Sequence, residues 1–277
     1  MKIKFWGTRG SIPVPDKKMF RYGGNTTCVE VTIGDRTIII DSGTGIINLG
    51  KKLVKEKKRD LDIFITHSHW DHIHGFPFFL PAYTSKTRIN VFGHTDSYEH
   101  FKTILTNQMS YEYFPVRFGD LKAEISFLDT RQVNLGNHSH RMSFIRANHP
   151  AYTMGIKIEE NEKSFVFITD NELYADKQLT SKDKFVEFCY GADYLVLDAQ
   201  FTDKEYKKTK NWGHSTFEQA FALAKLSKAK NLVFFHHDPN RTDKGLRKIE
   251  SKFKKLGKKT NYKFNVSAAK EKQEIIL

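Results

Sequence analysis

The 277-residue sequence has few of the residues that cross-link small secreted proteins or separate domains. It contains two cysteines, Cys28 and Cys189, which are too few for a disulfide framework and do not form the Cys-x-x-Cys pair typical of redox or zinc sites. Its seven prolines are scattered, and no glycine- and serine-rich linker divides the chain. We therefore predict two reduced thiols and a single domain over residues 1–277.

Long apolar segments are also absent. No stretch approaches the roughly 20 residues that a membrane-spanning helix needs. The first ten residues, MKIKFWGTRG, have neither the apolar run nor the cleavage site of a secretion signal. The sequence therefore predicts a cytoplasmic protein that does not enter a membrane.

Acidic residues are outnumbered, 32 against 45 lysines and arginines, which leaves a formal charge of +13. Basic surfaces attract phosphate-containing ligands. The lysines are spread along the chain, however, with modest clusters at 51–59, 204–210 and 252–259, and solvated helix faces produce such clusters without any ligand. The charge is compatible with a small anionic substrate, while nucleic acid is a less favoured partner. A homodimer is also compatible with the sequence, which has no specific signal for one.

The pattern of apolar residues predicts many strands and few helices. Strands over 27–33 and 36–41 are joined by a two-residue hairpin turn, Gly34-Asp35. Helices are predicted over 46–57 and over 215–227, where Ser215 and Glu218 would form a capping box. The other predicted strands are 3–6, 61–66, 89–92, 123–128, 142–148, 153–158, 164–169, 194–198 and 231–235. This succession favours an α+β fold in which two sheets pack together with helices outside.

A dense cluster of polar side chains follows the predicted strand over 61–66, and we expect these side chains to lie on a loop at the edge of the sheet. Three imidazoles and one carboxylate occupy six consecutive positions, and they are His67, His69, Asp71 and His72. Imidazole and carboxylate are ligands of zinc, manganese and iron. Burying them without a partner would carry a large desolvation cost. The cluster therefore predicts a metal site in preference to a solvated polar loop.

The spacing His-x-His-x-Asp-His after a short apolar strand resembles the signature of the metallo-β-lactamase superfamily. The resemblance implies a four-layer αββα sandwich, that is, two mixed β-sheets with helices outside. The strand over 37–41 ends in an aspartate that precedes Ser42-Gly43, as in the family. This implies that Asp41 is not a ligand itself but orients the metal ligands through hydrogen bonds.

The resemblance also implies three further ligands, each directly after a predicted strand: His149, Asp170 and His236. One divalent metal ion would be held by His67, His69 and His149. The second would be held by Asp71, His72 and His236, and Asp170 would bridge the two. Zinc is the expected metal, with manganese or iron as alternatives. His237 is an alternative to His236, because neighbouring residues of an extended strand point to opposite sides.

The segment Trp212-Gly213-His214-Ser215-Thr216 resembles the His-x-Thr or His-Ser-Thr motif of the ribonuclease Z and phosphodiesterase branch. In that branch the histidine acts as general acid, which implies that His214 donates a proton and that Asp198 orients it. Without the resemblance, a position flanking a capped helix would be the better interpretation of His214. The segments 7–13 and 23–26 resemble the same branch, so the resemblance covers nearly the whole chain.

Together these features imply a dinuclear metal-dependent hydrolase. The predicted substrate is a small phosphodiester, a cyclic nucleotide or a cyclic phosphate, attacked by a metal-bridging hydroxide. The predicted catalytic residues are His214, Asp198 and Asp71. Ribonuclease Z carries a long arm for transfer RNA, and the short segment 171–192 has none, which disfavours transfer-RNA processing. The alternatives are hydrolysis of a lactam, lactone or thioester at the same metals, and a ribonuclease or non-catalytic RNA-binding scaffold.

Two other groups of residues have less specific interpretations. The aromatic residues Trp70, Phe76, Phe78 and Tyr113 could stack on a substrate ring, although such residues are more often part of a core. His138 and His140 lie in a polar stretch without an Asp-His companion, and we expect both at the surface.

Overall fold

The computed structural model describes residues 1–94, 98–133 and 140–277. The chain divides into two compact units. The first comprises Met1–Pro13, Asn25–Asn134 and Glu271–Ile276, and the second comprises Val14–Gly24, Leu135–Lys270 and Leu277. Each unit contains one β-sheet with its own apolar core. The single domain over 1–277 stays a prediction.

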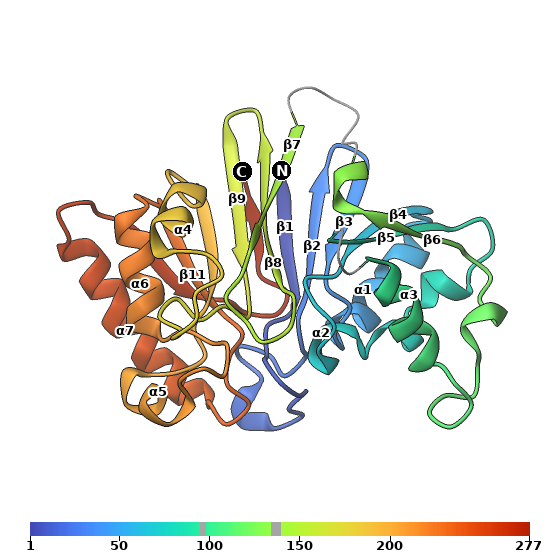
Figure 1. Cartoon of the computed structure of the whole chain (residues 1–277), viewed down its shortest axis with the longest axis horizontal. Coiled ribbons are helices and arrows are strands. Elements are labelled where there is room, and N and C mark those ends of the chain that lie inside the picture. The colour runs from blue at the N-terminus through green and yellow to red at the C-terminus, as the bar shows by residue number, and fades with distance from the viewer. Residues whose placement is uncertain (95–97, 134–139) are drawn as a thin grey trace. The chain divides into compact units, whose positions relative to one another are not determined.

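The first unit is built on a mixed sheet of seven strands (Figure 1). In spatial order the strands are β13 (Glu274–Ile276), β1 (Lys2–Gly7), β2 (Cys28–Ile33), β3 (Arg36–Ile40), β4 (Asp60–Phe64), β5 (Arg88–Gly93) and β6 (Glu124–Asp129). Neighbouring strands from β13 to β3 are antiparallel, and those from β3 to β6 are parallel. The predicted hairpin of the strands over 27–33 and 36–41 is confirmed by the antiparallel pairing of β2 and β3.

Helices cover one face of this sheet. They are α1 (Gly45–Lys55), α2 (Trp70–Ile73) and α3 (Tyr98–Asn107), with short 3-10 turns at Phe76–Phe78, Leu80–Tyr83, Phe118–Asp120 and Thr130–Gln132. Ile46, Leu49 and Leu53 recur at helical spacing on α1, so they form one apolar stripe. This stripe joins Phe101 and Leu105 of α3 and apolar residues of β4 and β5 in a single buried cluster.

The second unit has a mixed sheet of six strands. Their order is β12 (Asn265–Ala268), β11 (Asn231–Phe235), β10 (Tyr194–Asp198), β9 (Lys163–Ile168), β8 (Met154–Glu160) and β7 (His140–Arg146). The four strands β9 to β12 are parallel, while β7, β8 and β9 are antiparallel. Their apolar runs, such as Leu232 to Phe235, are fully buried, as expected of strands covered on both faces.

Helices of the second unit lie along one side of its sheet (Figure 1). They are α4 (Lys182–Phe188), α5 (Asp203–Thr209), α6 (Phe217–Leu226) and α7 (Asp243–Lys259), with a 3-10 turn at Lys17–Met19. Phe185, Phe217 and Phe253 bring α4, α6 and α7 into one buried cluster with β9, β10 and β11. Cys189 lies in this cluster and Cys28 in that of the first unit, and burial raises the pKa of both thiols. No helix in the described ranges is long and apolar enough to cross a membrane.

The helix predicted over 215–227 begins two residues later and has a different cap. Thr216 is the N-cap residue of α6, and it exchanges hydrogen bonds with Gln219. Ser215 instead donates its hydroxyl to the carbonyl of Asn171 at 2.6 Å and accepts the N–H of Leu173 at 3.1 Å. The predicted capping box of Ser215 and Glu218 is therefore wrong, because the loop after β9 binds the Ser215 side chain.

The segment 14–24 is fixed to α7 of the same unit. Tyr22 is fully buried, and its hydroxyl donates to Glu250 Oε2 at 2.7 Å. The N–H groups of Arg21 and Tyr22 donate to the carboxylate of Asp243 in the first turn of α7. These contacts tie the segment to a helix more than two hundred residues away in the sequence.

We predict that Tyr22→Phe lowers the free energy of unfolding by about 1–3 kcal/mol, because the buried carboxylate of Glu250 loses a donor. Urea unfolding followed by circular dichroism measures the change. Tyr190→Phe is the control, since Tyr190 is 57% exposed, and it should change stability by less than about 0.5 kcal/mol. Equal stability of the two variants would contradict a stabilising role for this hydrogen bond.

Candidate functional site

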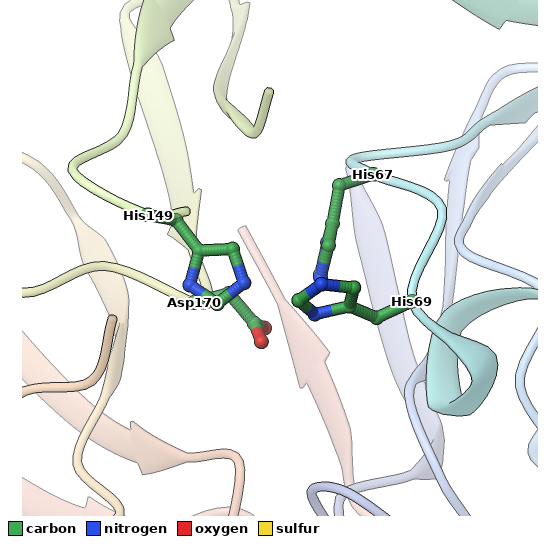
Figure 2. A group of neighbouring side chains, drawn as sticks. All are labelled: His67, His69, His149 and Asp170. Carbon is green, nitrogen blue, oxygen red and sulfur yellow. The ribbon is translucent and has the colours of Figure 1, made fainter. Parts of the chain in front are cut away.

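The predicted metal-binding cluster of the first unit lies where β4 leads into α2. His67 and His69 precede the helix, as Figure 2 shows, and their ring centroids lie 4.6 Å apart. His67 and His72 have ring centroids 4.2 Å apart. Asp71 and His72 lie within α2 itself, so the prediction that all four residues lie on a loop is wrong. The short helix turns the chain so that His67, Asp71 and His72 are buried and His69 is exposed.

Asp41 lies fully buried behind this cluster. Its Oδ2 is 2.8 Å from Nδ1 of His72, and its Oδ1 accepts the N–H of Thr66 at 2.7 Å. Burial raises the pKa of Asp41, and the hydrogen bonds from His72 and Thr66 act against that rise. As a carboxylate Asp41 can only accept, so the hydrogen of His72 lies on Nδ1 and the lone pair on Nε2. This is the arrangement expected of a residue that supports a metal ligand.

Asp71 is oriented by the N-terminal segment of the same unit. The N–H of Ser11 donates to Asp71 Oδ2 at 2.8 Å, and His72 Nε2 lies 3.2 Å from the same oxygen. Ser11 has a φ of 65°, a left-handed conformation that is uncommon for residues other than glycine. The segment 7–13 resembles the family in sequence, but the hydrogen bond from Ser11 to Asp71 was not predicted.

Candidate residues of the second unit lie at the carboxyl ends of its parallel strands. Asp198 ends β10, and Asp170 and His236 follow β9 and β11. Nε2 of His236 lies 3.3 Å from Oδ2 of Asp170. Asp198, His214 and His236 each offer a ligand atom, and these atoms lie within 4.8 Å of one another. Adjacent parallel strands end at the same edge of a sheet, which explains why residues so distant in sequence meet here.

Three of the candidate positions share a strained backbone. Asp41, Asp170 and His236 have φ values of 62°, 51° and 58°, and each comes within two residues of a strand end. The left-handed conformation costs roughly 1–2 kcal/mol for a residue with a Cβ. Strain of this kind is concentrated at functional sites, where the surrounding structure holds it in place.

His149 is held by the loop that precedes His214. Its Nδ1 lies 3.0 Å from the carbonyl oxygen of Gly213, which can only accept, so the lone pair of His149 is on Nε2. The buried carboxylate of Glu172 fixes this loop by accepting the N–H groups of Asn211 and Gly213 at 2.8 and 2.9 Å. Figure 2 shows the side chains of His149 and Asp170. Glu172 belongs to no recognisable sequence motif, so its role in fixing this loop was not predicted.

His214 and Asp198 form a close pair. His214 Nδ1 lies 2.7 Å from Asp198 Oδ2, and the buried Asp198 also accepts the N–H groups of Asn171 and Gln200, each at 3.2 Å. The ring of His214 stacks on that of His236 with centroids 4.9 Å apart. Because Asp198 binds Nδ1–H, Nε2 is the atom at which His214 can hold or release a second proton.

His237, the alternative to His236, points into the core. Its Nε2 lies 2.9 Å from the carbonyl oxygen of Ala269, and its ring meets the ring of Tyr22 edge to face at 5.9 Å. His237 is fully buried. The geometry therefore favours His236, the neighbour of Asp170, as the ligand candidate.

The residues with less specific interpretations are divided between core and surface. Phe76 is fully buried, so it is a core residue, whereas Trp70 and Tyr113 are exposed. His140, which we expected at the surface, is half-buried on β7, with its Nε2 3.2 Å from Glu160 Oε1 on the neighbouring strand. His138 lies outside the described residues.

Comparison with known proteins places this fold and these residues in a family. The family profile described as the beta-lactamase superfamily domain matches residues 36–237. Ribonuclease Z from Pyrococcus furiosus is 22% identical over 86% of this chain and 87% of its own. The metallo-beta-lactamase fold protein YhfI from Bacillus subtilis has a TM-score of 0.70 at 19% identity, covering 99% of this chain and 98% of that one. A diphosphatase from the PhnP family has a TM-score of 0.65 at 16% identity, covering 100% and 97%.

The chain belongs to the metallo-β-lactamase superfamily. Within it, the sequence is similar to ribonuclease Z, and the fold is similar to that of the PhnP-family diphosphatase. The predicted fold class, α+β with two mixed sheets and outer helices, is confirmed. The predicted enzyme class, a metal-dependent hydrolase, is confirmed as well. The assignment of individual ligands and catalytic residues rests on the family pattern and the local geometry.

We predict that Gly213→Ala destabilises the protein more than Gly191→Ala does. Both glycines have positive φ, 89° and 68°, so each alanine pays roughly 1–2 kcal/mol for the left-handed conformation. A Cβ at 213 would also lie 2.1 Å from Nδ1 of His149, whereas one at 191 meets nothing within 4 Å. Urea unfolding of both variants isolates the clash. Equal destabilisation would mean that His149 moves aside without cost.

Proposed function

We propose that this protein hydrolyses small phosphodiesters with the aid of two divalent metal ions. The family pattern assigns His67, His69 and His149 to one ion, Asp71, His72 and His236 to the second, and Asp170 to both. Zinc is the metal that we propose, with manganese or iron as alternatives, and we propose a cytoplasmic location.

The donor set fits such ions. Imidazole and carboxylate are ligands that zinc, manganese and iron all accept. His72 and His149 each direct a hydrogen at a buried oxygen acceptor, which turns the lone pair of Nε2 outward. Metal-binding histidines are held in this manner almost always. When bound, two such ions supply a water activated near neutral pH and neutralise charge on the phosphate.

The pair of His214 and Asp198 is the observation that carries the proposal. The alkoxide that leaves a phosphodiester needs a proton, and a positioned histidine can donate one. Asp198 orients the ring through Nδ1 and stabilises its protonated form, so that Nε2 can give its proton to the leaving oxygen. Hydrolysis of a thioester would leave this buried, fully hydrogen-bonded aspartate without a catalytic purpose, because a thiolate leaves without a proton.

A second candidate function is cleavage of RNA, because the curated relative is named ribonuclease Z. Between Asp170 and Asp198 the chain contains one helix, α4, and the strand β10, without the extended arm that sequence reasoning associated with transfer RNA. Incubation with precursor transfer RNA separates the two functions. Cleavage more efficient than that of small diesters would favour the ribonuclease, and salt-dependent binding without cleavage would favour a scaffold.

We predict that Asp41→Asn weakens metal binding about 10- to 100-fold, because an amide no longer fixes the His72 tautomer. Calorimetric titration of the metal-free protein with zinc and with manganese measures the affinity. Asp62→Asn is the matched control, since Asp62 is also a buried aspartate of the first unit but pairs with Arg36. If both variants bind metal like the wild type, Asp41 does not support a ligand.

We predict that His214→Ala lowers kcat about 10²- to 10⁴-fold for a diester with an alkoxide leaving group, such as a 2′,3′-cyclic nucleotide. The loss should be far smaller for bis-p-nitrophenyl phosphate, because p-nitrophenolate leaves without a proton. Asp198→Asn should show the same contrast, since it disturbs the His214 tautomer.

Steady-state kinetics on the two diesters and on a thioester tests this assignment. His100→Ala is the control, since His100 is exposed on α3. Equal losses on both diesters would contradict the role of His214 as acid. Thioester turnover that does not depend on His214 would favour the broader hydrolase function.

A further inference from the structure

The second unit contains a pocket of about 480 Å³ beside His149. Pro150, Ala175 and Leu179 line its apolar side, and Glu172 and Gly213 line it next to the histidine. All residues of the lining belong to the second unit. The pocket therefore adjoins a predicted metal ligand and the loop that carries the predicted acid, His214.

Two buried polar side chains of the lining, Glu172 and Asn148, already have hydrogen-bond partners within the protein. Glu172 accepts from Tyr206, Asn211 and Gly213. Asn148 accepts the N–H groups of Leu179 and Thr180 and donates to the carbonyl of Thr180. Because these hydrogen bonds are internal, an apolar group can enter the pocket without leaving Glu172 or Asn148 unsatisfied.

The charge of the lining disfavours a second anion. Two carboxylates, Glu172 and Asp176, face one ammonium group, Lys177. Lys210 pairs with Asp176 and lies outside the lining. A substrate that continued into the pocket with another phosphate would find no surplus of positive charge to hold it.

We propose that this pocket binds the uncharged organic group of the phosphodiester, of the size of a nucleoside. The inference rests on the proposed function, because a phosphate held near His149 would direct one of its ester groups to the adjoining pocket. Pockets for small organic ligands have volumes of roughly 300–1,000 Å³, and a methyl group would leave most of this one empty. A nucleoside ester or cyclic nucleotide therefore fits better than a continuing polynucleotide chain.

Two chromogenic substrates test the pocket, thymidine 5′-(p-nitrophenyl phosphate) and methyl p-nitrophenyl phosphate. Both release the same phenolate and differ in the group that would occupy the pocket. We expect wild type to favour the thymidine ester. In Leu179→Trp the ratio of kcat/KM for the thymidine ester to that for the methyl ester should fall about tenfold or more, through KM. Ala175→Leu, which narrows the same pocket, should lower the ratio in the same direction.

Leu226→Trp is the matched control, since Leu226 on α6 and Leu179 are similarly exposed, at 49% and 54%, and Leu226 is not part of the lining. Its ratio should equal that of the wild type. If both esters are hydrolysed and neither pocket variant changes the ratio, the pocket inference is overturned and the proposed function stands.

If neither ester is hydrolysed, the proposed function fails, and binding of thymidine itself decides the pocket. Calorimetric titration of wild type and Leu179→Trp makes this comparison without any turnover. Binding to the wild type that is lost in the variant supports the pocket. Equal binding to both, or none to the wild type, overturns it.

Discussion

The left-handed backbone at the ends of β3, β9 and β11 is the constraint on which the candidate site depends. Asp41, Asp170 and His236 each stop a buried strand and turn the chain within one or two residues. Glycine would adopt this conformation without strain but would bring no side chain. The left-handed conformation therefore costs roughly 1–2 kcal/mol of backbone strain at each of these three positions. The burial of the preceding strand offsets this cost.

A second constraint is the assignment of hydrogens on the imidazoles. Asp41, the carbonyl of Gly213 and Asp198 each lie within 3.0 Å of an Nδ1, on His72, His149 and His214 respectively. These oxygens make Nδ1 the donor in all three rings and leave Nε2 for a metal or a proton. The same hydrogen-bond arrangement therefore occurs at two candidate ligands, His72 and His149, and at the candidate acid, His214. A backbone carbonyl oxygen can fix the tautomer as a carboxylate does, because both only accept hydrogen bonds.

The sequence was sufficient where a signal is local and dense. The strands Tyr194–Asp198 and Asn231–Phe235 were predicted to the residue, because continuous apolar runs of that length are typical of buried parallel strands. The histidine cluster was found through its density. Strands β12 and β13 were missed, since four and three residues with polar neighbours give no periodic pattern. The 17-residue helix α7 was missed because its many lysines were interpreted only as a charge cluster.

Tertiary contacts explain the remaining errors. Ser215 is a good cap residue by type, but its hydroxyl binds the loop after β9, so Thr216 takes the position. Neighbouring histidines at 236 and 237 cannot be told apart by type, and their surroundings separate them: Asp170 beside one, Tyr22 and Ala269 around the other. The role of Glu172 depends on a loop some forty residues later in the chain.

The burial of Cys28 and Cys189 has a practical consequence. Both thiols are inaccessible and have raised pKa values, and the thiolate is the form that reacts with alkylating reagents. A cysteine introduced on the surface would thus be labelled selectively in the otherwise natural chain. One label in each unit would allow the distance between the units to be measured in solution by spin–spin coupling or energy transfer, with both native cysteines left in place.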